Sequence, residues 1–232
     1  MNNKQIAFSV TGRYALFTNP INKLGGEKFS YPVPTYEALR GVVSNIYWKP
    51  TILWKIDKVK VIKPIRTFAT GKTPRIFAGT EYPYTISYYT YLADVEYHVL
   101  AHYVFNHNQV NMLQDCDYGK HNEIVRHALK VGGRRNVFLG LRECQADVAP
   151  IEWTDEPEGY YKDRDEISFG MMFHSYLYPE ESGENKLYKR LWSAKMRHGI
   201  IDFTDPSIKL KEIFVRPMKA KIFENKYAEA SE

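Results

Sequence analysis

The chain is poor in cysteine and has no long hydrophobic run. Its 232 residues include two cysteines, Cys116 and Cys144, which lie far apart without a second pair. This excludes a disulfide framework and a zinc ribbon, and we expect two unpaired thiols. No stretch reaches about 18 consecutive apolar residues, and the opening MNNKQIAFSVTG lacks the pattern of a signal peptide. We therefore expect a cytoplasmic protein without a membrane partner.

The sequence also lacks the usual motifs of metal and nucleotide sites. HVLAH (98–102) and HNEIVRH (121–127) contain paired histidines, but neither carries the glutamate of an HExxH motif. On a helix, the spacing of six would place His121 and His127 about 120° apart. VGGRRNVFLG has paired glycines but no following GK[ST] and no dinucleotide fingerprint. We therefore predict neither a metal ion nor a cofactor.

Positive charge is concentrated in the first half of the chain. The net charge is +5, and between Trp48 and Phe77 eight lysines and arginines face one acid, Asp57. Residues 152–166 instead carry seven acids and two basic residues. The basic stretch is compatible with a surface for a polyanion, and equally with the solvated face of a strand such as KVKVIK. The eighteen tyrosines would suit base stacking or a hydrophobic core.

Periodicity predicts an α+β fold. Strands are expected over 4–11, 51–65, 87–105 and 136–148, the last interrupted by Gly140, and the second and third should pair antiparallel. A helix is predicted over 35–47, with Thr35 as its N-cap, and a second between Asp117 and Gly132. The resulting order of strand, helix, strand, strand, helix, strand is the arrangement of ferredoxin-like and RRM domains.

The composition changes after Pro150. The acidic segment EWTDEPEGYYKDRDE indicates a boundary, so we predict a ferredoxin-like domain over 1–150 and a smaller β-rich domain over 151–232. In the second part, strands are expected over 167–178 and 212–223, and a short helix over 186–197.

The segment YGKHNEIVRH, 118–127, is compatible with metal-free RNA cleavage. Attack of a ribose 2′-OH on its own 3′-phosphate needs a base, an acid and a positive charge beside the phosphorus. His121 and Lys120 lie in the first turn of the predicted helix, where the helix N-terminus and the lysine favour a neutral imidazole. His121 is also in line with Ile124, Val125 and Ala128, so the same pattern is typical of a core histidine. The local sequence leaves both interpretations open.

Two interpretations also remain for VGGRR. Gly132 and Gly133 could let the backbone approach an RNA phosphate while Arg134 and Arg135 donate charge-assisted hydrogen bonds. They could equally form a helix C-cap followed by an exposed basic turn.

Four segments resemble, in this order, the CRISPR-associated RAMP endoribonuclease family of the subtype I-C (Dvulg) system, the fifth-numbered Cas family in its Dvulg form. The segments are PVPTYEALRGVVSNIYWKPT, YTYLADVEYHVLAHYVF, GKHNEIVRHALKVGGRRNVFLGLRECQADVAP and RLWSAKMRHGIIDF. The likeness extends from Phe8 to about Phe223, and GGRRNVFLGLREC is its most specific part.

The resemblance implies a fold and an activity. The fold would be a ferredoxin-like RAMP domain followed by a smaller β-sheet domain. The activity would be metal-independent cleavage of precursor CRISPR RNA at the base of the repeat hairpin, leaving a 2′,3′-cyclic phosphate and a 5′-hydroxyl. The protein would then stay on the 5′ handle of the mature crRNA as a subunit of the type I-C interference complex. The alternative is a non-catalytic crRNA-binding backbone subunit.

The resemblance also implies the residues of the site. The family's catalytic positions fall on Tyr47, Lys120 and His121. We expect His121 to act as general base or acid, Lys120 to stabilise the phosphorane, and Tyr47 to position the RNA or donate a proton. The family's RNA-binding element falls on Arg126, Gly132, Gly133, Arg134 and Arg135.

Overall fold

The chain forms one large sheet with few helices. The computed structural model describes residues 5–19, 27–73 and 86–223. The strands are β1 (Gln5–Ala15), β2 (Lys28–Phe29), β3 (Ile52–Val61), β4 (Thr67–Lys72), β5 (Ser87–Phe105), β6 (Val137–Phe138), β7 (Gln145–Pro150), β8 (Glu166–Leu177), β9 (Lys186–Arg197), β10 (Ile200–Asp202) and β11 (Lys211–Pro217). The helices are α1 (Tyr36–Ile46), the 3-10 helix η2 (Val110–Asp115), α2 (Tyr118–Lys130) and α3 (Pro179–Ser182). None of the helices in these ranges is long and apolar enough to cross a membrane.

The strands belong to one 11-stranded, mainly antiparallel sheet. Its neighbours follow the order β11-β9-β10-β3-β5-β1-β7-β6, while β2 and β4 pair with β5, and β8 pairs with β9. The 19-residue strand β5 joins these parts. Along one edge it pairs with β1 over 92–102, and along the other with β3 over 97–105 and β4 over 87–92. The predicted α+β class and the antiparallel pairing of 51–65 with 87–105 are therefore confirmed.

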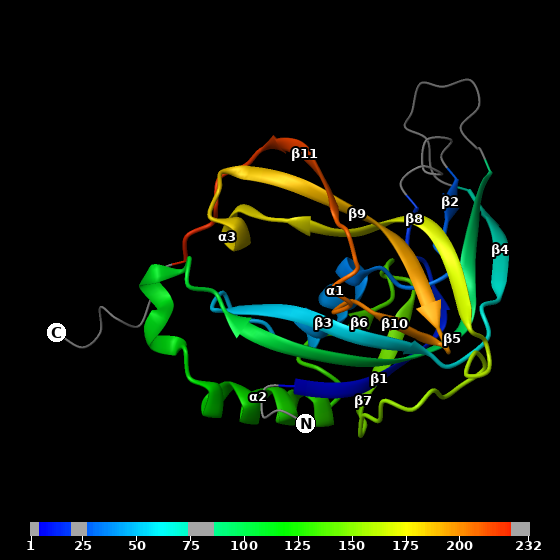
Figure 1. Cartoon of the computed structure of the whole chain (residues 1–232), viewed down its shortest axis with the longest axis horizontal. Coiled ribbons are helices and arrows are strands. Elements are labelled where there is room, and N and C mark those ends of the chain that lie inside the picture. The colour runs from blue at the N-terminus through cyan, green and yellow to red at the C-terminus, as the bar shows by residue number, and fades with distance from the viewer. Residues whose placement is uncertain (1–4, 20–26, 74–85, 224–232) are drawn as a thin grey trace.

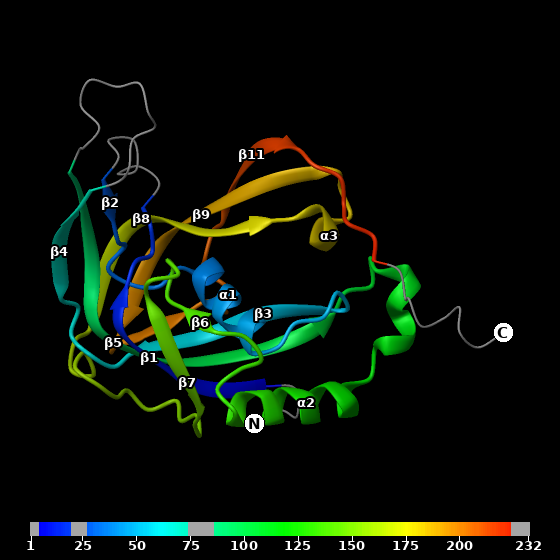
Figure 2. The same ribbon diagram turned by 180° about the vertical axis from the view of Figure 1, so that it is seen from behind.

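Helix α1 lies inside the bend of the sheet. Figures 1 and 2 show β8 and β9 passing over β3 and β5, with α1 between the two layers. The helix contacts β3 and β8. Its buried stripe has the predicted helical spacing: Leu39, Val42, Val43 and Ile46. Thr35 accepts the Ala38 amide at 3.2 Å, and Tyr47 is the C-cap. The helix predicted over 35–47 is confirmed, with both ends where they were expected.

Helix α2 has the predicted N-cap and a glycine after its C-terminus. The Asp117 carboxylate accepts the amides of Gly119 and Lys120. At the other end, Gly132 has a φ of +83°, and the amides of Gly132 and Gly133 donate to carbonyls of the last turn. This is the Schellman pattern, in which a left-handed glycine closes the helix. In Figure 1, α2 runs along the lower side of the molecule below β1.

Two predicted elements are wrong. The single strand expected over 136–148 is a pair of short antiparallel strands, β6 and β7. Gly140, at a φ of +94°, lies in the turn, where an added Cβ would be 1.9 Å from the Leu16 carbonyl oxygen. The helix expected over 186–197 is strand β9, because Trp192, Ala194 and Met196 are buried at every second position. That period of two matches a sheet and not a helix.

The strands after Pro150 continue the sheet of the first half. β10 pairs with β3, and β9 pairs with β10. Two lysines of β3 contact the acidic segment: Lys58 Nζ lies 2.9 Å from Asp155, and Lys60 Nζ lies 2.9 Å from Glu158. Lys60 is buried, so it belongs neither to a solvated face nor to an RNA surface. The division into two domains at residue 150 remains a prediction.

Between the layers, a histidine is buried in an aromatic cluster. The His174 ring stacks on Tyr36 at 4.4 Å and meets Trp192 edge-on at 5.5 Å. Burial, together with nearby arginine and lysine charges, lowers the pKa of His174 from 6.5 to about 3. The folded protein therefore holds this imidazole neutral.

This histidine should make the protein less stable in mild acid. Below pH 6.5 the unfolded chain binds a proton at His174 that the folded chain does not, so stability falls as the pH decreases toward 3. Between pH 7 and pH 5, His174 alone should lower the free energy of unfolding by about 2 kcal/mol. Guanidinium unfolding at both pH values should show a smaller loss for His174→Phe, and the full loss for the exposed control His107→Asn. Equal losses in all three proteins would contradict the assignment.

Candidate active site

A buried hydrogen bond joins the end of α1 to the first turn of α2. The Tyr47 hydroxyl lies 2.8 Å from Nδ1 of His121, although 74 positions separate them in the sequence. Both residues have no exposed surface. Tyr47 is placed by the C-terminus of α1 and by Trp54, whose indole N–H donates to the Tyr47 carbonyl at 2.7 Å. The structure thus brings together two of the three predicted catalytic residues.

Two hydrogen bonds of His121 determine which tautomer its neutral ring adopts. Its Nε2 lies 2.6 Å from the backbone carbonyl oxygen of Asp115, which can only accept. Nε2 therefore carries the proton, and Nδ1 of the neutral ring accepts from the Tyr47 hydroxyl. Burial raises the pKa of Tyr47 despite the opposing charge of Arg134, so the phenol stays protonated at neutral pH.

The third predicted residue, Lys120, lies beside them at the surface. Its side chain is 49% exposed, and its Nζ is 2.5 Å from Oδ1 of Asp115. Burial raises the pKa of the Asp115 carboxyl, but the Lys120 hydrogen bond and the charges of His121, Lys120 and Lys49 outweigh burial and hold it below its usual range. The Asp115 carboxyl is thus ionised at neutral pH.

The VGGRR segment holds the end of α1. The amides of Arg134 and Arg135 donate to the carbonyls of Ile46 and Asn45, both at 3.1 Å. These carbonyls lie in the last turn of α1, where the helix itself offers no donor. The Arg134 guanidinium carbon lies 4.9 Å from the centre of the Tyr47 ring, a cation–π contact. The same five residues therefore cap α2 and fix the position of Tyr47.

The three predicted RNA-binding arginines are exposed. Arg126 and Arg135 are exposed, and Arg134 is exposed while its guanidinium contacts the Tyr47 ring. His127 is exposed on α2 while His121 is buried, in line with their separation around the helix. The two histidines do not meet.

Other candidates for metal or redox chemistry lie apart from one another. His98 contacts Glu158 at 2.8 Å, and His102 contacts Asp57 at 2.7 Å. Over residues 5–19, 27–73 and 86–223, no group of three or more His, Cys, Asp or Glu side chains is arranged to hold a metal ion. Cys116 and Cys144 are free thiols, as predicted.

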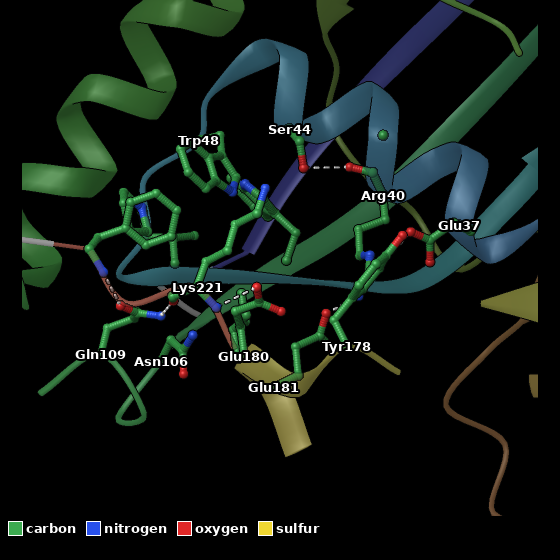
Figure 3. A pocket seen from close by; sticks show the side chains of 16 residues that line it. Glu37, Arg40, Ser44, Trp48, Asn106, Gln109, Tyr178, Glu180, Glu181 and Lys221 are labelled. Carbon is green, nitrogen blue, oxygen red and sulfur yellow. Dashed lines mark hydrogen bonds and ion pairs between the residues drawn. The ribbon is translucent and has the colours of Figure 1, made fainter. Parts of the chain in front are cut away.

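A pocket of about 370 Å³ lies beside the end of α1 without containing the site. Figure 3 shows Trp48 on one side of it, and Arg40 between acidic side chains on the other. Arg40 is paired with Glu37 at 2.7 Å and with Glu181 at 2.5 Å. Neither Tyr47 nor His121 lines this pocket. With its arginine neutralised by two acids, the pocket is not suited to a polyanion.

The wall of this pocket connects the C-terminal segment to η2. Gln109, the residue before η2, donates from Nε2 to the Lys221 carbonyl at 2.8 Å and accepts the Phe223 amide at Oε1 at 3.1 Å (Figure 3). A buried side-chain amide thus holds two backbone groups of the last described residues.

Sequence reasoning missed Asp115 and Thr51. Thr51 Oγ1 donates to Oδ2 of Asp115 at 3.2 Å, and Asp115 contacts both Lys120 and His121. Asp115 precedes Lys120 by only five residues, but it ends a 3-10 helix that has no buried residue and no apolar period. Thr51 lies in the turn before β3, far from α2 in sequence, and carries no local signal of this contact.

The chain is similar in sequence and in structure to known CRISPR-associated proteins. The family model Cas_Cas5d, described as "CRISPR-associated protein (Cas_Cas5)", matches residues 5–204. A Mannheimia succiniciproducens protein named CRISPR pre-crRNA endoribonuclease Cas5d is 30% identical, over 85% of this chain and 94% of that protein. A Thermus thermophilus protein of the same name is 26% identical, over 90% and 95%. A solved structure described as "Crystal Structure of CRISPR-associated Protein" is 35% identical, with a TM-score of 0.70 over 88% of this chain and 93% of that one.

Replacing Gly133 should loosen the junction of the two helices. Gly133 has a φ of +104°, and an added Cβ would lie 3.2 Å from the Arg135 carbonyl oxygen and 3.5 Å from Cα of Ile46. Gly133→Ala should lower the free energy of unfolding by about 1–3 kcal/mol, measured in guanidinium. The control is Gly41→Ala in the exposed middle of α1, where a Cβ meets nothing within 4 Å and should stabilise by about 0.5–1 kcal/mol. Changes of the same sign would show that Gly133 is not constrained.

Proposed function

Because the chain belongs to the Cas_Cas5d family of CRISPR-associated proteins, as the match over residues 5–204 shows, we propose that it is a metal-independent endoribonuclease that cleaves precursor CRISPR RNA within the repeat. The observation that carries this proposal is the meeting of Tyr47, Lys120 and His121 at one place from two separate helices. The curated relatives named pre-crRNA endoribonuclease support the substrate class.

The proposed reaction is a transesterification at the base of the repeat hairpin. The ribose 2′-oxygen attacks the neighbouring phosphorus and loses its proton to a base, while the bond to the 5′-oxygen breaks and that oxygen gains a proton. The products are a 2′,3′-cyclic phosphate and a 5′-hydroxyl. The steps need a proton acceptor, a proton donor and a cation, which His121, Tyr47 and Lys120 can supply.

Each residue has a role that its surroundings support. His121 exchanges protons with the RNA, since an imidazole can take or give one near pH 7. Tyr47 holds Nδ1 of His121 and remains a protonated donor, because burial raises its pKa. Lys120 is exposed, and its ammonium can stabilise the charge that develops on the phosphorane.

The exposed basic groups would hold the RNA backbone around this site. We assign this role to Arg126, Arg134 and Arg135, and to the turn formed by Gly132 and Gly133. The turn's glycines already have structural roles in closing α2 and approaching α1. A direct contact between their backbone and a phosphate is a further part of the proposal.

The proposal extends to the fold and to the fate of the product. The order β3-β5-β1-β7, with α1 and α2 in the connections, supports a ferredoxin-like core. By family resemblance, the protein would act in the cytoplasm, remain on the 5′ handle of the mature crRNA, and join the other subunits of a type I-C interference complex.

A second function is favoured by one observation. Tyr47 and His121 are fully buried, as expected of core residues in a non-catalytic crRNA-binding subunit. In that case the same basic surface would bind crRNA, and the buried pair would serve only to join α1 to α2.

Cleavage of a repeat RNA in EDTA separates the two functions. The parent protein should cut a transcript of its own repeat at one position, and His121→Ala should slow single-turnover cleavage about 10²–10⁴-fold, because one acid or base supplies a factor of that order. RNA affinity should change little. The matched control is His127→Ala on the exposed face of α2, which should cleave normally.

A second control tests the mechanism. A repeat RNA with 2′-deoxyribose at the cleaved position should bind but resist cleavage, because the attacking oxygen is missing. If the parent protein leaves the repeat RNA uncut in EDTA, the result would favour the non-catalytic subunit. Cleavage of the deoxy substrate would exclude transesterification.

Removal of the exposed arginines should weaken binding without changing its specificity. Arg134→Ala and Arg135→Ala should each make the slope of log binding constant against log salt concentration shallower, by about the amount that one phosphate contact contributes. The measurement is fluorescence anisotropy with repeat RNA over a series of salt concentrations. Arg216→Ala on β11 is the control, since Arg216 is equally exposed but lies on another part of the sheet. Arginine variants that match this control would not belong to the RNA-binding surface.

A further inference from the structure

The Asp115 carboxylate lies among the polar groups that the proposed reaction uses. Its Oδ1 is 2.5 Å from Lys120 Nζ. Its Oδ2 accepts from the Thr51 hydroxyl at 3.2 Å and lies 3.6 Å from Nε2 of His121. The carboxylate is therefore held by the one lysine assigned to phosphate chemistry and lies next to the one histidine assigned to proton transfer.

The groups around the carboxylate form an anion-binding site. A lysine ammonium and a hydroxyl converge on it, and the Lys49 charge also acts on it. A phosphodiester presents two anionic oxygens that accept hydrogen bonds from the same donors. Thr51 has no exposed surface, so its hydroxyl is fixed in place by the fold. The donor set would thus suit an RNA phosphate as well as it suits a carboxylate.

The carboxylate is more exposed than His121 and less exposed than Lys120. His121 has no exposed side-chain surface, Asp115 has 14%, and Lys120 has 49%. Exposure thus increases in the order His121, Asp115, Lys120. An RNA phosphate that reaches Lys120 from solvent meets the Asp115 carboxylate before it meets the histidine. A phosphate and the Asp115 carboxylate bound to the same lysine would repel each other.

We propose that the Asp115 carboxylate occupies the binding position of the scissile phosphate in the RNA-free protein, and that the phosphodiester replaces it on Lys120 and Thr51. This rests on the proposed function, and it adds Thr51 to the residues that bind the reacting group. Only the carboxylate has to turn away. A phosphate oxygen at the position of Oδ2 would lie 3.6 Å from Nε2 of His121, whose proton stays hydrogen-bonded to the Asp115 backbone carbonyl.

The test is a binding measurement that does not depend on cleavage. Asp115→Asn removes the charge and keeps both the size of the side chain and the backbone carbonyl that accepts from His121. The matched control is Asp117→Asn, which removes an exposed charge two residues away, while asparagine remains a good N-cap. The probes are inorganic phosphate and a repeat RNA carrying 2′-deoxyribose around the hairpin base.

Asp115→Asn should bind both probes about tenfold more tightly than the parent, since one charge-assisted hydrogen bond no longer has to be broken. Asp117→Asn should change the affinities by about twofold or less, through screened charge alone. Adding Thr51→Val to Asp115→Asn should remove part of the gain. Equal affinities for Asp115→Asn and Asp117→Asn would overturn the proposal, as would slower cleavage with unchanged binding, which would make Asp115 a positioning residue.

A measurement on the parent chain keeps the test independent of the stability of the variant. On addition of phosphate, the side-chain carboxyl ¹³C resonance of Asp115 should shift as it leaves Lys120, and that of Asp117 should not. No shift at saturating phosphate would refute the displacement.

The two proposals can fail separately. Tighter binding by Asp115→Asn together with an inactive parent would support the phosphate-binding position and refute the catalytic function. Cleavage by the parent, with no gain in binding by Asp115→Asn, would support the catalytic function and refute the phosphate-binding position.

Discussion

The structure around the site depends on how the C-terminal end of α1 is closed. The last carbonyls of a helix need donors, and here the amides of Arg134 and Arg135 supply them from the segment that follows α2. Because that segment is itself fixed by the Schellman turn at Gly132, the end of one helix determines where the other can lie. The 2.8 Å contact between Tyr47 and His121 is a consequence of this arrangement. A residue at the end of α1 can therefore meet one at the start of α2 although β3, β4 and β5 separate them in sequence.

Much of the fold could be predicted from local signals. The limits of α1 follow from Thr35 and an apolar stripe, and the start of α2 from Asp117. β9 was mistaken for a helix because its buried period of two, at Trp192, Ala194 and Met196, was not recognised. The hairpin after α2 was missed because its turn depends on the close approach of Gly140 to Leu16, a contact made only in the folded chain.

The candidate site was less accessible to prediction. His121 looked like either a core histidine or a reactive one, and the structure shows that it is buried and also bonded to Tyr47. Family resemblance, not local pattern, pointed to Tyr47. The charge along the sequence was misleading too, because Lys58 and Lys60 of the basic stretch pair with Asp155 and Glu158 of the acidic stretch. Such pairing depends on β3 lying beside the segment after residue 150, which composition does not reveal.

The two partners of His121 suit both of its protonation states. The Asp115 carbonyl accepts from Nε2–H whether the ring is neutral or charged, and the Tyr47 oxygen can either donate to Nδ1 or, after rotation of its hydroxyl hydrogen, accept from it. No heavy atom has to move when the ring gains a proton. The imidazole can therefore be charged and discharged within a rigid core, and the reorganisation that usually accompanies proton transfer in water is confined here to the turning of one O–H bond.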